Sequence, residues 1–454
     1  MAPKSSSKTS LDSFVKNRTL LIIAAIAMVS MIVLMVVNAV NFSPGGSGPN
    51  SNVQADLVMW GVWDDSNLMR NYISDFSALY PNVSITYRKL TIQEYEQELI
   101  DALAAGRGPD IFAMHHTWLG KHKDKMQPMP EEIMTLREYQ ERFLDVVHTD
   151  FIEDNQVWGF PLYTDTLSLF YNKDAFADAG ITTPPETWEE FQDTVERLTK
   201  IDQFGNIDQA GVAMGTGENV VRSPDILSAL MIQSGAQMND PADPAQITFN
   251  QSARANGANT NPAQLALQFY TDFANPRKTV YTWNLAQNFS TDAFYEREAA
   301  MMLGYSYHVE QVKARSPRLN FDVAPLPQIS TDQNLLGYAN YWGYTTSVQS
   351  QHGAVAYEFL KYITEQENAQ NYFLATKRPT ARRDLVDMQS EDTEYGVFVD
   401  QTIFARSWKQ PDNNAVDQIF IEAIDNVNRG LVSYQEAISN AQSEIQLIAR
   451  QNRQ

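Results

Sequence analysis

Apolar and polar residues follow two different periods after residue 54, and the switch between them predicts strands followed by helices. Short runs of Val, Ile, Met and aromatic residues are typical of buried strands. Between these runs, apolar residues recur every three or four positions, first from Ser66 to a stop at Pro81 and then after Thr91. Strands that alternate with helices predict an α/β protein with parallel strands. The first three strands are expected at residues 57–63, 83–90 and 111–114.

Two helix starts carry a reciprocal capping pattern. Thr91 is followed three positions later by Glu94, and Thr187 by Glu190, so each pair can satisfy two backbone amides of a helix start. Further along the chain the same periods predict more elements of both kinds. Strands are expected at residues 211–215, 247–250, 321–328 and 337–348, and helices at residues 354–375 and 414–450.

The N-terminal region contains an apolar run without charge at residues 19–40. At about 1.5 Å per residue, this length can cross a hydrocarbon core of roughly 30 Å. Lys4, Lys8, Lys16 and Arg18 precede the run, so the positive-inside rule predicts a cytoplasmic segment at residues 1–18 and export of the rest. A cleaved signal peptide is the alternative, but its apolar region is shorter. Residues 41–54, rich in Gly, Ser, Pro and Asn, predict a flexible linker.

Composition excludes several classes of function. The chain has 454 residues, of which 43% are hydrophobic, and this length favours two folded parts rather than one. Its formal charge of −21 argues against nucleic acid as a partner, because phosphate binding needs a concentrated basic surface. The absence of cysteine excludes disulfides, thiol catalysis and zinc–thiolate sites.

Four segments in order resemble the extracellular solute-binding proteins of the maltose-binding, carbohydrate-uptake class. The most specific is VWGFPLYTDTLSLFYNKDAFADAGITTPPETWEEF at residues 157–191, with its G-x-P, YNK and TW elements. DALAAGRGPDIFAM (101–114), EREAAMMLGYSYH (296–308) and TKRPTARRD (376–384) are similar to weaker family segments. In the third segment a Glu stands where the family usually has Gly. The resemblance covers most of residues 55–454.

The resemblance implies a two-lobed periplasmic-binding-protein-like α/β fold of type II, and the apolar run at residues 19–40 predicts a transmembrane helix before it. The lobes would close on a ligand held in the cleft between them. The implied function is capture of a carbohydrate, expected to be an oligosaccharide, by a monomer that delivers it to the permease subunits of an ABC importer. No catalysis and no cofactor are implied. The resemblance places the first lobe at residues 55–163 and 326–376 and the second at residues 164–325 and 377–454.

Residues of the types that bind sugars lie in the expected cleft segments. Aromatic rings cover the apolar faces of sugars, and the carboxylate, amide and guanidinium groups of Asp, Asn and Arg bond the hydroxyls. By motif position, Asp165 resembles the family's hinge carboxylate, and Tyr305 or Tyr307 stands near its stacking aromatic. His116 and Trp408 lie in segments that often contact ligand. The full candidate set is Trp63, Asp64, His116, Trp118, Tyr163, Asp165, Tyr305, Tyr307, Tyr341, Trp342 and Trp408.

Structural roles compete with these assignments. The apolar rings of the 157–180 segment are expected in the core. Asn172 can fix a strand-to-helix turn through its own backbone. Asp165 is as well suited to a structural cap in the hinge as to a ligand contact. The rings expected in the core are Trp158, Phe160, Phe170 and Phe176.

Other chemistry remains open at this stage. The spacing of His115, His116 and His122 fits no common metal-ligand set. Asp64 and Asp65 lack the glycine and terminal glutamate of a calcium loop. A glycan-processing enzyme with Asp64 or Asp65 and Asp165 as its carboxylate pair is the rival class. A ligand sensor with the same binding fold is a third possibility.

Overall fold

The computed structural model describes residue 50 and residues 52–452, except residues 256–257 and 333–334. It contains two compact units, Met1–Gln54 with Ala78–Asn82 and Ala55–Ser77 with Val83–Gln454. In the first unit, the Val53 amide donates to the Asn50 carbonyl over 3.1 Å. The expected membrane segment, residues 19–40, lies outside the described residues. Within the described part, no helix is both long and apolar enough to span a bilayer.

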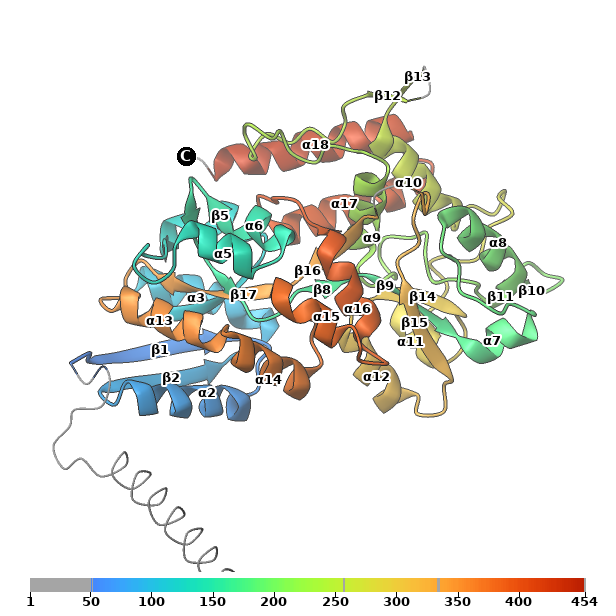
Figure 1. Ribbon diagram of the computed structural model, residues 1–454. Coiled ribbons are helices and arrows are strands. Elements are labelled where there is room, and N and C mark those ends of the chain that lie inside the picture. Colours follow the sequence, from blue (N-terminus) through green and yellow to red (C-terminus); the bar gives the residue numbers. More distant parts are fainter. Residues whose placement is uncertain (1–49, 51, 256–257, 333–334, 453–454) are drawn as a thin grey trace, which may run out of the picture. The chain divides into compact units, whose positions relative to one another are not determined.

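The second unit contains a six-stranded sheet that defines what we call the first lobe (Figure 1). Its central strand β3 pairs in parallel with β1, which pairs in parallel with β2. All five residues of β3 are buried, as expected for a parallel strand covered on both faces. Strand β17 runs antiparallel to β3 and brings Trp342 opposite His115. The strands are β1 (Ala55–Gly61), β2 (Val83–Lys89), β3 (Ile111–His115), β4 (Met126–Gln127), β7 (Phe160–Pro161) and β17 (Trp342–Ser347).

Amphipathic helices cover this sheet because each has one apolar stripe to bury. In α2 the stripe includes Met69, Tyr72 and Phe76, and the ring of Phe76 meets Phe359 of α13 edge-on at 5.2 Å. Helix α13 also packs against β17. The helices of this group are α2 (Ser66–Leu79), α3 (Ile92–Ala104), α13 (Gly353–Ile363) and α14 (Gln366–Thr376).

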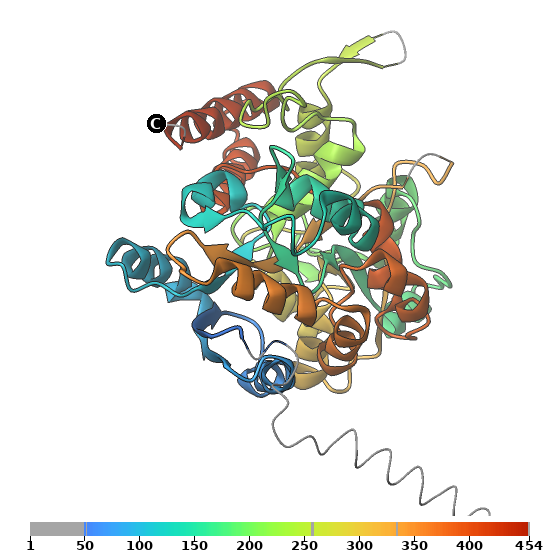
Figure 2. The same ribbon diagram turned by 60° about the vertical axis from the view of Figure 1, so that its left-hand side comes forward.

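A separate antiparallel sheet defines the second lobe. Strand β9 (Ser168–Asn172) lies between β14 (Met301–Gly304) and β15 (Phe321–Pro325). One core cluster surrounds this sheet and continues into the C-terminal helices α17 (Asn413–Asn428) and α18 (Tyr434–Gln451). These two helices pack against each other, as both views show (Figures 1 and 2).

A small three-stranded sheet lies where the chain passes between the two larger ones. It contains β8 (Asp165–Thr166), β16 (Gly337–Asn340) and β18 (Ala405–Arg406). Strand β8 follows the first-lobe strand β7 and leads into β9, whereas β16 leads into β17 of the first lobe. The antiparallel pairing of β8 with β16 places Asp165 opposite Asn340. Two passages of the chain between the lobes therefore lie side by side.

The remaining elements connect or cover these sheets. Around the first lobe they are α4 (Leu119–His122), η1 (Lys123–Lys125), α5 (Leu136–Arg142), α6 (Asp145–Phe151), β5 (Ile152–Glu153) and β6 (Gln156–Val157). The others are α7 (Lys173–Asp178), α8 (Trp188–Leu198), β10 (Lys200–Ile201), β11 (Ile207–Gln209), α9 (Ser223–Gln233), β12 (Ala253–Ala255), β13 (Ala258–Thr260), α10 (Pro262–Asp272), α11 (Ser290–Tyr295), α12 (Tyr307–Arg315), η2 (Arg383–Leu385), α15 (Val386–Gln389), α16 (Gly396–Gln401) and η3 (Thr402–Phe404).

Several sequence expectations needed correction. Residues 211–215 are buried but form no regular strand; the Ala213 amide bonds the Met301 carbonyl at 3.0 Å instead of joining a ladder. Residues 247–250 also form no strand, and Ile247 makes one isolated bridge to Asn239. The three longest expected elements are each interrupted. Residues 337–348 form β16 and β17, residues 354–375 form α13 and α14, and residues 414–450 form α17 and α18.

Of the two capping boxes expected from the sequence, one is confirmed and one is wrong. Thr187 and Glu190 form the complete reciprocal capping box of α8. Thr91 is the N-cap of α3, but its side chain caps no backbone amide and its hydroxyl instead donates to the Glu94 carboxylate at 3.0 Å. The expectation for Asn172 is confirmed, because its Oδ1 accepts from the amides of Asp174 and Ala175 at the start of α7.

Candidate ligand site between the lobes

Four aromatic rings surround Trp342 at the edge of the first lobe where β1 and β3 end. Trp342 meets Trp118 at a centroid distance of 5.1 Å and His115 at 5.4 Å. Tyr95 lies 6.0 Å away and Trp63 6.2 Å away. All four contacts are edge-to-face, a favoured geometry for aromatic pairs. The β17–β3 pairing builds this cluster, because it brings Trp342 beside the loop that follows β3.

A cavity of about 560 Å³ opens on this cluster, and we call it the aromatic cavity. Trp118, Trp342 and Tyr95 supply its rings. Its polar groups come from both lobes and include amides, two ammonium groups, an imidazole and a carboxylate. They are Gln93, Glu96, Gln97, Lys121, His122 and Lys125 from the first lobe, and Asn413, Asn414 and Asn452 from the C-terminal helices and their ends.

Direct contacts close the aromatic cavity against the second lobe. The indole Nε1 of Trp118 donates to Asn413 Oδ1 over 3.0 Å. Lys121 Nζ lies 2.6 Å from Glu96 Oε1 and 2.7 Å from Asp412 Oδ2. Burial alone would raise the pKa of Glu96, but hydrogen bonds from His122 and Lys121 lower it below its ordinary value. The start of α17 is thus held against α3 and α4.

Sequence reasoning missed this group. It singled out Trp118 and Trp342 but not Glu96, Lys121 or the Asn413–Asn414 pair. Lys121 and Glu96 look like ordinary residues of a solvated helix face, and Asn413 and Asn414 look like a helix start. The local signal was the position of Lys121 three residues after Trp118, which was itself a candidate residue.

Asp165 is buried at the passage between the lobes. Its carboxylate accepts hydrogen bonds from the Ser306 amide at 3.1 Å, the Ser306 hydroxyl at 2.7 Å and the Thr166 amide at 2.9 Å. Burial raises the pKa of Asp165 to about 6, although these bonds and the charge of Arg378 act to lower it. The chain itself therefore occupies both carboxylate oxygens.

Asp64 and Tyr163 belong to a second bonded group. Asp64 is buried and accepts from the hydroxyls of Tyr344 at 2.5 Å and Tyr372 at 2.6 Å, and from Arg378 at 3.1 Å. The Arg378 guanidinium also lies over the Tyr163 ring, 4.8 Å from its centroid. Asp64, Tyr163, Trp63 and Trp342 border a void of about 10 Å³, which has room for no more than about one water.

His116 and Tyr341 form a third buried group with Asp150. The two rings stack at 4.9 Å with an interplanar angle of 10°. The Tyr341 hydroxyl donates to Asp150 Oδ2 at 2.6 Å, and His116 Nδ1 lies 3.2 Å from the same oxygen. Both rings are buried, and neither lines the aromatic cavity.

Tyr305 and Tyr307 lie in the second lobe beside an unexpected ion pair. Tyr305 is buried, and its hydroxyl donates to Asp225 Oδ2 at 2.6 Å. Arg222, whose φ of 64° is unusual for a side chain other than glycine, binds both oxygens of Asp225 at 2.7 and 2.8 Å. Tyr307 stacks on Tyr305 at 6.1 Å and is 43% exposed.

Asn340 connects this ion pair to the first lobe. Its Nδ2 donates to Asp225 Oδ2 at 3.1 Å, and its Oδ1 lies 3.2 Å from His115 Nε2. Because the amide oxygen can only accept, His115 must carry its proton on Nε2 and accept the Thr117 hydroxyl at Nδ1, 2.8 Å away. Burial and the neighbouring His116 lower the pKa of His115 well below its ordinary value.

Trp408 lies apart from the other candidates. It is buried in the core cluster of the second lobe, where its ring is 6.1 Å from Phe420 and 6.4 Å from Phe249. Its Nε1 donates to the Ser228 hydroxyl at 3.3 Å. The four rings of the 157–180 segment expected in the core, Trp158, Phe160, Phe170 and Phe176, are buried. In the described part of the chain, no three His, Asp or Glu side chains are grouped as metal ligands would be.

Known proteins match this chain over most of its length. The galactooligosaccharide-binding protein of Bacillus subtilis (strain 168) is 21% identical over 363 residues, which cover 78% of this chain and 81% of that protein. The maltodextrin-binding protein MdxE of the same organism is 21% identical over 341 residues, covering 72% and 75%. Among solved structures, the sugar-binding protein MalE from the phytopathogen Xanthomonas citri has the same two-lobed fold, with a TM-score of 0.70, 19% identity, and coverage of 88% and 98%.

A family profile agrees with both comparisons. The profile described as bacterial extracellular solute-binding protein matches residues 60–370, which include β3, the YNK segment and β17. This range covers more than half of the chain. The protein therefore belongs to the bacterial extracellular solute-binding protein family.

Proposed function

We propose that this protein captures a carbohydrate between its two lobes outside the cell and delivers it to an ABC importer. The observation that carries the proposal is the aromatic cavity, where Trp118, Trp342 and Tyr95 meet amide and charged groups from both lobes. Pyranose rings present apolar C–H faces together with a rim of hydroxyls, and this combination of side chains suits both. The names of the relatives, which bind galactooligosaccharide and maltodextrin, support a sugar as the ligand.

Binding without turnover fits the carboxylates better than glycoside hydrolysis does. A glycosidase needs two carboxyl groups free to act on either side of the scissile bond. Asp64 is bonded to two tyrosine hydroxyls and Arg378, and Asp165 to Ser306 and Thr166. Neither aspartate lines the aromatic cavity. We therefore favour a binding protein over the enzyme.

The division into lobes is also a proposal. We place the first passage between lobes at Tyr163–Asp165, as the sequence suggested. Leu326 and Tyr338 pack in the core of the second lobe, so the second passage is better placed near Asn340 than near Leu326. Thr380 forms a bridge with Tyr163 of the first lobe, which favours a third passage after residue 380. This pattern of three connections is that of a type II fold. It would let the two lobes of one monomer close on a single ligand.

Residues 19–40 would anchor the protein in the membrane. The proposal rests on the uncharged length of this run, on the basic residues before it and on the linker at residues 41–54. The family description supports a binding domain outside the cell. An anchor would hold that domain near the permease subunits and raise the effective concentration of the loaded protein there.

Calorimetric titration with a panel of neutral mono- and oligosaccharides tests the carbohydrate proposal. We expect Trp342→Leu to weaken binding by roughly tenfold to a hundredfold, because a buried ring–sugar contact of this size contributes about 1.5–3 kcal/mol. Phe204→Leu is the control, because Phe204 is 80% exposed and is not among the residues that line the cavity. Wild-type protein that binds no sugar of the panel would contradict the proposed ligand class.

A further inference from the structure

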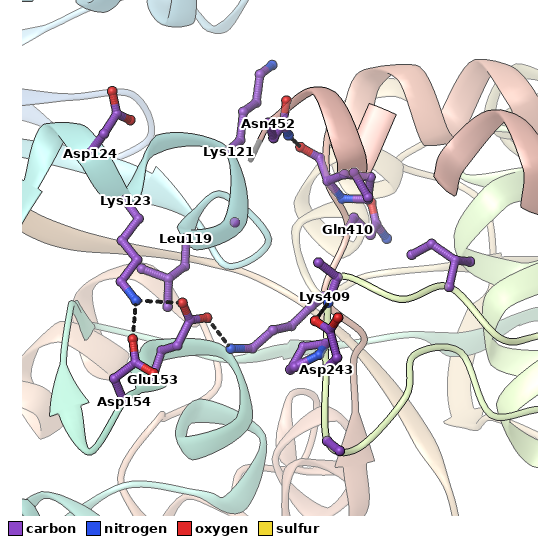
Figure 3. A pocket seen from close by; sticks show the side chains of 17 residues that line it. Leu119, Lys121, Lys123, Asp124, Glu153, Asp154, Asp243, Lys409, Gln410 and Asn452 are labelled. Carbon is purple, nitrogen blue, oxygen red and sulfur yellow. Dashed lines mark hydrogen bonds and ion pairs between the residues drawn. The ribbon is translucent and has the colours of Figure 1, made fainter. Parts of the chain in front are cut away.

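A second and larger cavity lies next to the aromatic cavity, and we call it the Gln410 cavity (Figure 3). Its volume is about 680 Å³. Lys121 and Asn452 line both cavities, and both hold the same short segment: Lys121 pairs with Asp412, and Asn452 Nδ2 donates to the Pro411 carbonyl at 2.7 Å. None of the eleven residues expected from the sequence lines the Gln410 cavity.

The lysines that line the Gln410 cavity are already neutralised. Figure 3 shows Lys123 between Glu153 and Asp154, at 2.7 and 2.6 Å, and Lys409 paired with the other oxygen of Glu153 at 2.7 Å. Lys121 has its own partners in Glu96 and Asp412. An anionic ligand would have to break these pairs to gain a cation, so the cavity is suited to a neutral ligand.

Gln410 places a buried amide oxygen without a hydrogen-bond donor in the lining of this cavity. The residue is 6% exposed, and no donor among the described residues of the chain reaches its Oε1. Its Nε2 donates to the Tyr338 hydroxyl over a long distance of 3.5 Å. A buried carbonyl oxygen without a donor is costly, and a ligand hydroxyl would satisfy it. Leu119, Ile247 and Pro411 supply apolar wall for the C–H faces of the same ligand.

We propose that the carbohydrate site extends past Lys121 into the Gln410 cavity, so that the preferred ligand is a neutral oligosaccharide occupying both cavities. One end of the chain lies against Trp118 and Trp342. The other end lies in the Gln410 cavity, where a hydroxyl donates to Gln410 Oε1. Each cavity alone has the volume of an ordinary small-ligand site, so a ligand filling both must be extended. This inference rests on the proposed carbohydrate function.

Titration with malto-, galacto- and manno-oligosaccharides from disaccharide to hexasaccharide tests the extension. We expect the affinity of the full-length protein to increase with the length of the chain. Gln410→Met keeps the shape of the side chain and removes its amide oxygen. It should weaken binding of the longest ligand about fivefold, as loss of one neutral hydrogen bond does, and leave the disaccharide unchanged.

A second variant does not depend on a buried substitution. Ala242 is exposed at the rim of the Gln410 cavity, so Ala242→Trp should fill the entrance without disturbing the core. It should remove the affinity gained with length and leave disaccharide binding intact. Ala177→Trp, at an exposed position on α7, is the matched control and should change neither.

The outcomes separate this inference from the function on which it rests. If the aromatic cavity holds one end of every oligosaccharide, Trp342→Leu should weaken the binding of ligands of every length. Affinity independent of length, or Gln410→Met and Ala242→Trp variants that bind hexasaccharide as well as wild type, would overturn the extension and keep the carbohydrate function. Wild-type protein silent towards the whole series would overturn both.

Discussion

At the scale of single residues, Asp165 has the features of a structural carboxyl at the passage between the lobes. Ser306 and Thr166 supply its three hydrogen bonds, and it is only 3% exposed. The motif position in the sequence identified the residue as important. It could not reveal that Ser306, far along the chain, would occupy the carboxylate, because that contact depends on how β14 pairs with β9.

Burial of Asp165 predicts a pH dependence of stability. Its pKa of about 6 in the folded protein exceeds the ordinary value near 3.9, so the protonated carboxyl stabilises the fold at low pH. That stabilisation is lost as the pH rises through about 6. We expect Asp165→Asn to remove the loss: the stability of the variant relative to wild type should increase by up to about 3 kcal/mol between pH 4 and 7. Urea unfolding at a series of pH values measures the difference.

His308 provides a comparison of opposite sign. Burial lowers the pKa of His308 to about 4, and its Nδ1 accepts the Tyr305 amide at 3.0 Å. The neutral ring therefore stabilises the fold above about pH 6.5, and this contribution is lost as the pH falls towards 4. The stability of His308→Gln relative to wild type should decrease over the interval in which that of Asp165→Asn increases. Parallel curves for wild type and Asp165→Asn would contradict the assignment.

At the scale of elements, local patterns predicted one capping box correctly but did not decide every strand. The reciprocal capping box of Thr187 and Glu190 formed, whereas the same spacing at Thr91 and Glu94 gave only a side-chain hydrogen bond. The strand expected at residues 211–215 did not form, although Val212, Ala213 and Met214 are buried. Burial depends on apolar side chains, whereas a strand also needs a neighbouring ladder of backbone groups. Only tertiary pairing supplies that ladder.

Gly215 ends this irregular segment, and its substitution should be severe. Its φ is +125°, and an added Cβ would lie 2.7 Å from the Ala274 amide nitrogen. Gly205 has a φ of +88° with nothing within 4 Å of the same position. We expect Gly205→Ala to cost about 1–2 kcal/mol for its backbone conformation. Gly215→Ala should cost roughly 3–5 kcal/mol, because the clash with fixed backbone adds to the same strain.

Chemical unfolding of the two alanine variants compares these costs directly. The two substitutions are identical in chemistry and both occur at positive φ, so the difference between them measures the crowding around Gly215. Equal losses of unfolding free energy would contradict the close packing of Gly215 against Ala274.

At the scale of the whole molecule, contacts between lobes involve residues that are very distant in sequence. Trp118 and Asn413 are 295 positions apart, and Asn414 donates to Glu96 across 318 positions. These contacts form because the chain between β18 and the start of α17 runs beside Glu153, with which Lys409 pairs. They decide which polar groups lie near Trp118 and Trp342 in the lining of the candidate site.

The proposed anchor is a second property of the whole molecule. We expect the full chain to remain in the membrane fraction after alkaline carbonate extraction, because 22 uncharged residues at positions 19–40 can span the bilayer. Ile32→Arg places a charge near the middle of the run at a cost of about 2.5–3.5 kcal/mol and should reduce membrane retention. Mass spectrometry of the intact protein is the complementary measurement. A mature chain that begins after Val40 would show a cleaved signal peptide instead.

The sequence by itself determined the family, the α/β class, most strands of the first sheet and the aromatic residue types of the candidate site. These features depend on local periodicity and on one specific motif, which the chain carries in full at residues 157–191. The sequence placed Trp63, Trp118 and Trp342 in one candidate set. In the structure, the rings of Trp63 and Trp118 both contact Trp342, because the ends of β1 and β3 and the start of β17 share one sheet edge.

Only the tertiary structure decided which candidates are free to meet a ligand. It placed Trp408 in the core, bonded Asp64 and Asp165 to other parts of the chain, and brought Lys121 to Asp412. The physical reason is the same in each case. A polar or aromatic side chain looks alike in the sequence whether a partner satisfies it or not, and the partners here come from other elements of the fold.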